Sequence, residues 1–232
     1  MNQEHAIETG TFWSAVTIAV YLASKWFYRT RPSVWASPMV MAPLLMMMLA
    51  VILHVNYGQY QIGTQWLITL FAPATVAFAI PVYEERALIR AHWPVLVMGA
   101  VAGSLTAVAF SWFACNWLGL NKDLCLSLLP RSVSTPFAVF VSGQIGGTPP
   151  LTAVFVLLTG IFGATLGELL LRSLPLRSAV ARGALFGMGA HGFGAAKAHQ
   201  IDREIGSVAS LVMVFSGLLN VMAAPLLGRL LH

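Results

Sequence analysis

Two short stretches carry the side chains that could do chemistry in an otherwise apolar sequence. The first surrounds Arg131, which follows Pro130 in an apolar run, and the second places His191 and Lys197 among glycines. A guanidinium, hydroxyls and the N–H groups at the start of a half-helix all attract a carboxylate. We therefore predict a binding site for a small organic anion. Its candidate residues are Arg131, Ser132, Ser134, Thr135, Pro136, Ser142, Gly143, Gly146, Gly147, His191, Gly192, Gly194 and Lys197.

Each of these side chains also has a purely structural interpretation. Arg131 could extend to the membrane interface or pair with Glu168 or Asp123. The Ser and Thr hydroxyls could bond to carbonyls of their own helix. His191 could bind substrate or relay a proton, because imidazole titrates nearest neutral pH, or it could bond to a backbone carbonyl. Lys197 could mark a helix end near the interface.

The composition is that of an integral membrane protein. Of the 232 residues, 58% are hydrophobic and 9% are charged, and the mean hydropathy is +0.78. Soluble domains usually contain about 25% charged residues, so an ordinary soluble domain is excluded. The net charge of +5 is spread over the loops without a basic cluster. That distribution sets membrane orientation and gives no indication of a nucleic-acid partner.

Apolar runs of membrane length fill most of the chain, and we predict an all-α integral membrane protein with a single membrane domain over residues 1–232. Full transmembrane helices of roughly 20 residues are expected at residues 11–28, 34–54, 64–82, 94–118, 151–171 and 206–231. The segment 64–82 contains Pro73 and Pro81 and should be a kinked helix. The polar segment 83–93 is expected to be a short surface helix.

Two further apolar segments, 124–150 and 183–206, contain too many helix breakers for an ordinary span. Prolines and glycines recur through the first and glycines through the second. In hydrocarbon an unpaired backbone polar group costs several kcal/mol, so irregular backbone persists only inside protein or beside a water-filled cavity. Interrupted segments of a transport protein mark the substrate site. We predict that both segments are broken or re-entrant helices that build the site.

The positions of the basic residues indicate how these two segments enter the membrane. Cytoplasmic loops should hold the excess of Lys and Arg. If 124–150 returns to its own side, the basic residues within 25–31, 86–90 and 172–182 share one face. If 183–206 dips in from the cytoplasmic side, the two segments enter from opposite faces, as an inverted repeat requires. The expected location is the bacterial inner (cytoplasmic) membrane, with a multi-pass topology.

No residue pattern indicates catalysis or a bound cofactor. The sequence lacks a Ser-His-Asp order, an HExxH motif, a paired-Cys motif and an acidic metal loop, which are the local signatures of hydrolases and metal sites. We expect no enzymatic activity, no cofactor and no metal. Cys115 and Cys125 are interpreted as buried packing residues.

Three longer runs resemble a bacterial family. They are YEERALIRAHWP, SLLPRSVSTPFAVFVSGQIGGTPPLTAVFVLLTGIFGA and ARGALFGMGAHGFGAAKAHQIDREIGSVASL. Together they look like the LrgB/CidB family, from roughly Pro73 to the C-terminus and more loosely over the first two spans. The resemblance implies a fold similar to the cation/proton antiporters and bile-acid symporters, with broken helices in inverted repeats.

The resemblance implies two functions. The family was first described as antiholin-like or holin-like regulators of murein hydrolase export and autolysis, whereas related proteins carry glycolate, glycerate or pyruvate. We favour a carrier of small monocarboxylates that works by alternating access, because a simple pore needs no concentration of helix breakers, hydroxyls and cations. In that mechanism Arg131 and the half-helix start at residues 134–136 hold the carboxylate, and His191 and the glycine-rich segment around it close the other side. The expected partners are a small organic anion, the lipid bilayer, an LrgA/CidA-like small membrane protein and a second copy of the chain in a homo-oligomer, a dimer.

Overall fold

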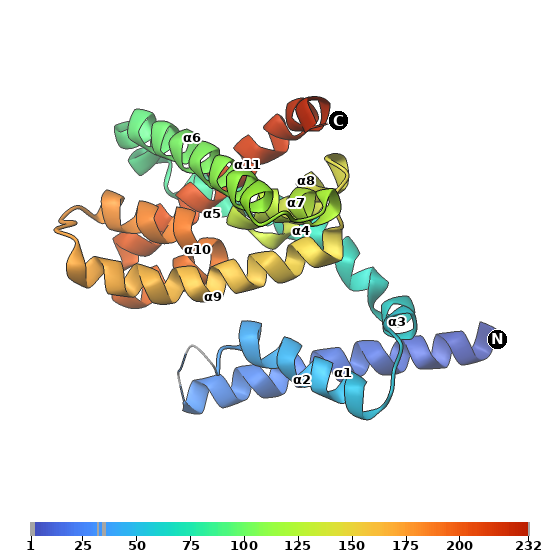
Figure 1. Ribbon diagram of the computed structural model, residues 1–232. Helices are drawn as coiled ribbons and strands as arrows, with labels where there is room; N and C mark the ends of the chain where they lie inside the picture. The colour runs from blue at the N-terminus through green and yellow to red at the C-terminus, as the bar shows by residue number, and fades with distance from the viewer. Residues whose placement is uncertain (1–2, 32, 34–35, 232) are drawn as a thin grey trace. The chain divides into compact units, whose positions relative to one another are not determined.

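The computed structural model describes residues 3–31, 33 and 36–231, and these ranges form helices joined by short turns (Figure 1). Within them no strand occurs, which confirms the all-α prediction. The chain divides into two compact units, Met1–Pro73 and Ala74–His232. Each unit is described by itself.

In the described residues, unit 1 contains three whole helices and the start of a fourth, α4, which lies across the division. They are α1 (Gln3–Thr30), α2 (Pro38–Ile52), α3 (Tyr57–Thr69) and α4 (Phe71–Ala77). Unit 2 contains the remaining helices. They are α5 (Ala79–Glu84), α6 (Arg86–Trp117), α7 (Lys122–Leu128), the 3-10 helix η1 (Leu129–Ser132), α8 (Thr135–Gln144), α9 (Pro149–Ser173), α10 (Ala179–Ile201) and α11 (Arg203–Leu231).

Unit 1 is held together along α1, which contacts both α2 and α3. The buried Trp13 ring meets the Tyr60 ring edge-on, with 5.9 Å between ring centroids. The Ser14 hydroxyl donates to the Gly63 carbonyl and accepts a hydrogen bond from Trp66 Nε1 at 2.7 Å. Aromatic packing and these polar contacts together fix α3 against α1.

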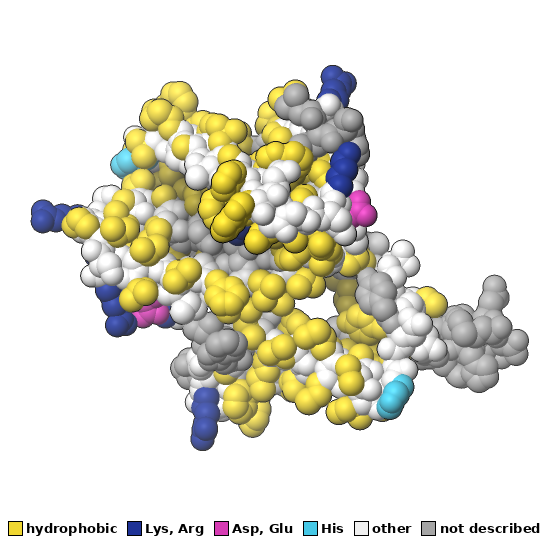
Figure 2. Space-filling model, in the orientation of Figure 1, with side chains coloured by type: hydrophobic (Ala, Val, Ile, Leu, Met, Phe, Trp, Pro, Cys, Tyr) yellow, Lys and Arg dark blue, Asp and Glu magenta, His cyan; other side chains and the backbone are white. Residues whose placement is uncertain are grey.

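Three helices of the described chain are long and apolar enough to cross a membrane by length and composition: α6, α9 and α11. They coincide with the predicted spans 94–118, 151–171 and 206–231. Apolar side chains cover much of the visible face over α6 and α9 (Figure 2). The predicted spans 11–28 and 34–54 fall on α1 and on the shorter apolar helix α2, and residues 34 and 35 lie outside the described residues. Six spans and the inverted repeat therefore stay predictions.

The predicted kinked helix at 64–82 is divided into the end of α3, then α4 and α5. Pro73 cannot donate to the carbonyl of Thr69, and Pro81 cannot donate to that of Ala77, so each proline removes one bond of a continuous helix. The chain breaks at Leu70 and Phe78, beside those two carbonyls. The predicted surface helix at 83–93 is also absent, because most of that segment forms the first turns of α6.

The first breaker-rich segment, 124–150, is interrupted as predicted. After η1 the backbone becomes extended at Val133, and Pro136 stands in the first turn of α8. A turn at residues 145–148 then leads to Pro149 at the start of α9. Proline is well tolerated in a first helical turn, since the N–H it lacks has no partner there. Pro136 and Pro149 therefore lie in the first turns of α8 and α9, after the chain has already turned.

The second breaker-rich segment, 183–206, is mostly helical. Its glycines lie within α10, and the backbone departs from helix at His191 (φ 39°, ψ −118°) and again at Asp202, before α11 begins. The glycines allow close packing: a Cβ at Gly194 would overlap the Phe186 carbonyl, and one at Gly183 would lie 2.5 Å from Val208 Cβ. The buried core between α10 and α11 includes Phe186, Ile205 and Ala209.

Replacing Gly146 by alanine is expected to lower the free energy of unfolding by about 1 kcal/mol, because Gly146 has φ +82° in the turn before α9 and a Cβ is strained there. Gly143→Ala is the matched control. Gly143 is helical and a Cβ there would meet nothing nearer than Pro149 Cγ at 3.9 Å, so alanine should leave stability unchanged or raise it. Denaturation by SDS in mixed micelles measures both variants, and equal effects would refute this role of the turn.

Candidate functional site

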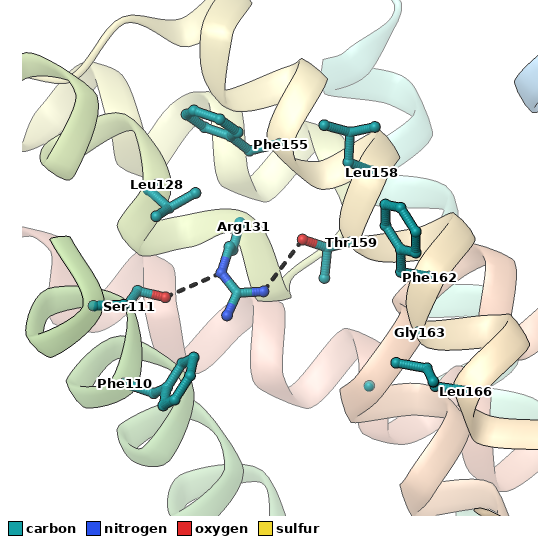
Figure 3. Close-up of a pocket in the computed structure, with 12 residues that line it drawn as sticks. Phe110, Ser111, Leu128, Arg131, Phe155, Leu158, Thr159, Phe162, Gly163 and Leu166 are labelled. Carbon is teal, nitrogen blue, oxygen red and sulfur yellow. Dashed lines mark hydrogen bonds between the residues drawn. The ribbon is translucent and has the colours of Figure 1, made fainter. Parts of the chain in front are cut away.

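Arg131 lines a cavity of about 460 Å³ between α6 and α9 (Figure 3). The half-buried guanidinium donates from Nε to the Ser111 hydroxyl of α6 at 3.1 Å and from Nη1 to the Thr159 hydroxyl of α9 at 3.3 Å. The 3-10 turn of η1 carries the guanidinium to this position. Two hydroxyls from two helices therefore aim one cation into the cavity.

The charge of Arg131 has no acidic partner among the described residues. The ion pairs found there join Glu168 to Arg172 at 3.1 Å and to Lys197 at 2.9 Å. The alternative that Arg131 pairs with Glu168 is therefore not realised. Neutral hydroxyls replace only part of the water that a guanidinium loses on burial, so the positive charge of Arg131 is only partly stabilised by its neighbours. In the described hydrogen bonds its Nη2 group remains available for an incoming anion.

His191 lies beside this cation in an unusual backbone conformation. Its φ is 39°, its side chain is 2% exposed, and its Nε2 atom has no hydrogen-bond partner among the described residues. The imidazole is close enough to interact with the backbone and the charge of Arg131. A positive φ in a residue other than glycine costs of order 1–3 kcal/mol and persists only when the surroundings impose it. The break in α10 therefore positions a buried imidazole next to the Arg131 turn.

A network of hydrogen bonds between side-chain hydroxyls and backbone groups connects α7, α8 and α9. The Thr152 hydroxyl lies 2.7 Å from the Ser142 hydroxyl and 2.9 Å from the Ser127 carbonyl. The Thr148 N–H donates to the Ser127 hydroxyl at 2.8 Å. Gly147 has no room for a side chain, since a Cβ would approach the Ser142 hydroxyl to 2.6 Å. This network fixes the two half-helices on either side of the Arg131 turn.

Replacing Thr152 by valine is expected to destabilise the protein by about 1–3 kcal/mol, because the change keeps the shape but leaves buried polar groups of Ser127 and Ser142 without this partner. Thr165→Val on the same helix is the control, since the exposed Thr165 hydroxyl bonds only to its own helix at the Ile161 carbonyl. The midpoint of SDS denaturation measures the difference. Equal midpoints for the two variants would contradict a stabilising network.

The structure brings some of the predicted residues together and leaves others apart. Arg131 and His191 are neighbours. Ser134 is buried and its hydroxyl has no partner among the described residues. Ser142 and Gly147 belong to the hydroxyl network. Lys197 is bound to Glu168 instead.

The other predicted residues have surroundings of several kinds. Ser132 lines a narrow crevice with Ser104 and Asn220. Thr135 and Pro136 are half-buried at the start of α8, Gly143 and Gly146 are exposed, Gly192 is partly buried and Gly194 is packed against Phe186. None of these lines the Arg131 cavity. They remain candidate binding residues only as predictions.

Sequence reasoning missed the side chains that orient Arg131. Ser111 and Thr159 are 20 and 28 residues away from it along the chain, each a single hydroxyl within a regular apolar helix. A hydroxyl on a helix usually bonds to its own backbone, so neither gave a local signal. In the described part of the chain, no group of three His, Cys, Asp or Glu side chains could hold a metal ion.

Comparison with known proteins gives one consistent family. Residues 17–230 match the LrgB-like family. The chain is 36% identical to the uncharacterized protein YwbG of Bacillus subtilis, over 91% of this chain and 94% of that protein. It is 28% identical to the holin-like protein CidB of Staphylococcus aureus, over 94% of this chain and 95% of that protein. No solved structure matches the chain.

Proposed function

Because this chain belongs to the LrgB family, we propose that it has a holin-like role and forms or controls a passage through the bacterial cytoplasmic membrane. The observation that supports this role is the likeness to the holin-like protein CidB, which extends over 94% of this chain. The apolar helices α6, α9 and α11 have the length and composition for such a location. In this proposal the chain is a multi-pass protein that acts as a homo-oligomer, with a small LrgA/CidA-like membrane protein as partner, in controlling murein hydrolase export and autolysis.

A second function, carriage of small monocarboxylates by alternating access, is favoured by one specific observation. Arg131, whose guanidinium has no acidic partner in the described part of the chain, lies in a cavity between two apolar helices. A pore for general leakage has no need of an oriented anion-binding group, whereas a carrier must hold its substrate. The break at His191 and the break before α8 supply the irregular backbone that transport proteins place beside their substrate.

Flux through proteoliposomes distinguishes the two functions. The purified chain is reconstituted with and without an LrgA/CidA-like partner, and two signals are recorded: release of a neutral dye and uptake of labelled pyruvate. Dye release that grows linearly with concentration gradient supports the holin-like role. Saturable uptake of pyruvate, or of labelled 4-methylpentanoate measured in parallel, without dye release supports the carrier. The absence of both signals with and without the partner would contradict the carrier and would also contradict a passage formed by this chain.

A further inference from the structure

The Arg131 cavity is polar only around Arg131 itself. Apart from Arg131 and the hydroxyls of Ser111 and Thr159, its lining consists of apolar side chains and glycines. Phe110 and Leu128 face it from one side, and Phe155 and Phe162 face it from α9 (Figure 3). The two hydroxyls already accept hydrogen bonds from the guanidinium. The rest of the cavity therefore offers contact area and almost no hydrogen-bonding capacity to a ligand.

We propose that this cavity binds a carboxylate that carries an apolar body, such as a branched-chain, aromatic or medium-chain acid, in preference to short hydroxylated acids. The inference rests on the second function above, in which Arg131 holds an anion, and it names the class of that anion. The carboxylate meets the Nη2 side of the guanidinium, which is planar and suited to a two-oxygen partner. The apolar body fills the space between Phe110 and Phe162.

Hydroxylated acids are disfavoured for a physical reason. Each ligand hydroxyl that leaves water must find a new partner, and an unpaired one lowers affinity. In the cavity such a group would face phenyl rings and leucine side chains. An apolar body, by contrast, gains affinity from every carbon that leaves water. The volume of about 460 Å³ is within the range of sites for ligands larger than two- or three-carbon acids.

The mouth of the cavity is also apolar. Phe110 on α6 is 61% exposed, and Phe162 and Leu166 on α9 are 64% and 54% exposed. Both helices have the length and composition of membrane spans. An acid with an apolar body can partition into hydrocarbon and reach a mouth of this kind, whereas glycolate and glycerate remain in water. The apolar mouth and the apolar lining of the cavity therefore both favour a carboxylate with an apolar body.

Equilibrium binding to the full chain in phosphatidylcholine nanodiscs tests the inference without depending on flux. Three probes are compared: 4-methylpentanoate, glycerate, and 4-methylpentanamide, which keeps the apolar body but has no charge. We expect 4-methylpentanoate to bind at least tenfold more tightly than either of the others. Phe162→Ser should reduce its preference over glycerate several-fold. Phe113→Ser is the control, since Phe113 is equally exposed on α6 but does not line the cavity.

The possible failures have different meanings. Equal binding of glycerate and 4-methylpentanoate would overturn the inference about the apolar body and leave the anion site intact. Equal binding of the acid and the amide would overturn the role of charge, and with it the carboxylate class. Binding of neither acid would contradict the anion site itself, on which the carrier function depends. Retention of the preference in Phe162→Ser would show that the apolar body lies elsewhere and would also overturn the inference.

Discussion

Replacing Arg131 by glutamine is expected to weaken carboxylate binding at least about 30-fold. The guanidinium is half-buried, is oriented by Ser111 and Thr159, and has no acidic partner among the described residues. Loss of one member of a desolvated, hydrogen-bonded charge pair costs about 2–5 kcal/mol, and each 1.4 kcal/mol is tenfold in affinity. Titration of labelled 4-methylpentanoate into nanodiscs that contain the variant measures this loss.

Two further variants separate charge from geometry. Arg131→Lys keeps the charge but cannot offer a planar fork, so we expect binding intermediate between wild type and Arg131→Gln. Arg90→Gln removes a cation from the exposed surface of α6 and should bind the ligand as wild type does, because exposed charges are screened by salt. Equal losses in Arg90→Gln and Arg131→Gln would mean that the net charge of the protein attracts the ligand and that no specific site exists.

Replacing Gly163 by alanine is expected to lower the free energy of unfolding by about 3 kcal/mol or more. A Cβ at Gly163 would overlap the backbone carbonyl oxygen of Gly189, which cannot turn aside as a side chain could. Overpacking of a close contact costs typically 1–3 kcal/mol and more when backbone must move. Both glycines line the Arg131 cavity, so separation of α9 from α10 should weaken ligand binding as well.

Gly99→Ala provides the matched control for this substitution. Gly99 is in α6, and a Cβ built there meets no atom within 4 Å, so alanine should be neutral or slightly stabilising through helix propensity. Thermal unfolding of the detergent-solubilised variants, followed by circular dichroism, gives both values. A Gly163→Ala midpoint equal to that of Gly99→Ala would show that α9 and α10 are not packed as closely as the structure places them.

The sequence predicted those parts of the fold that depend on composition and on proline. The spans that became α6, α9 and α11 are long apolar runs, and such runs have few alternatives to a helix in an apolar environment. Pro130 and Pro136 marked the first break because each removes a backbone donor. The family resemblance also proved correct.

What could not be predicted depended on tertiary packing. The glycines of the second segment were interpreted as breakers, but in α10 they allow contact with α9 and α11, and the break falls at His191. Ser111 and Thr159 were missed because their role exists only once α6 and α9 lie on either side of η1. The pairing of Lys197 with Glu168 joins α10 to α9 and likewise has no local signal.

Location of a heavy-atom ligand tests most directly the claim that Arg131 anchors a carboxylate in the cavity between α6 and α9. Crystals of the protein grown with 4-bromobenzoate would give the bromine position by anomalous scattering. We predict a bromine peak between Phe110 and Phe162, with the carboxylate within hydrogen-bonding distance of the Arg131 guanidinium. A bromine peak away from this cavity, or an empty cavity at a ligand concentration that saturates binding in solution, would contradict it.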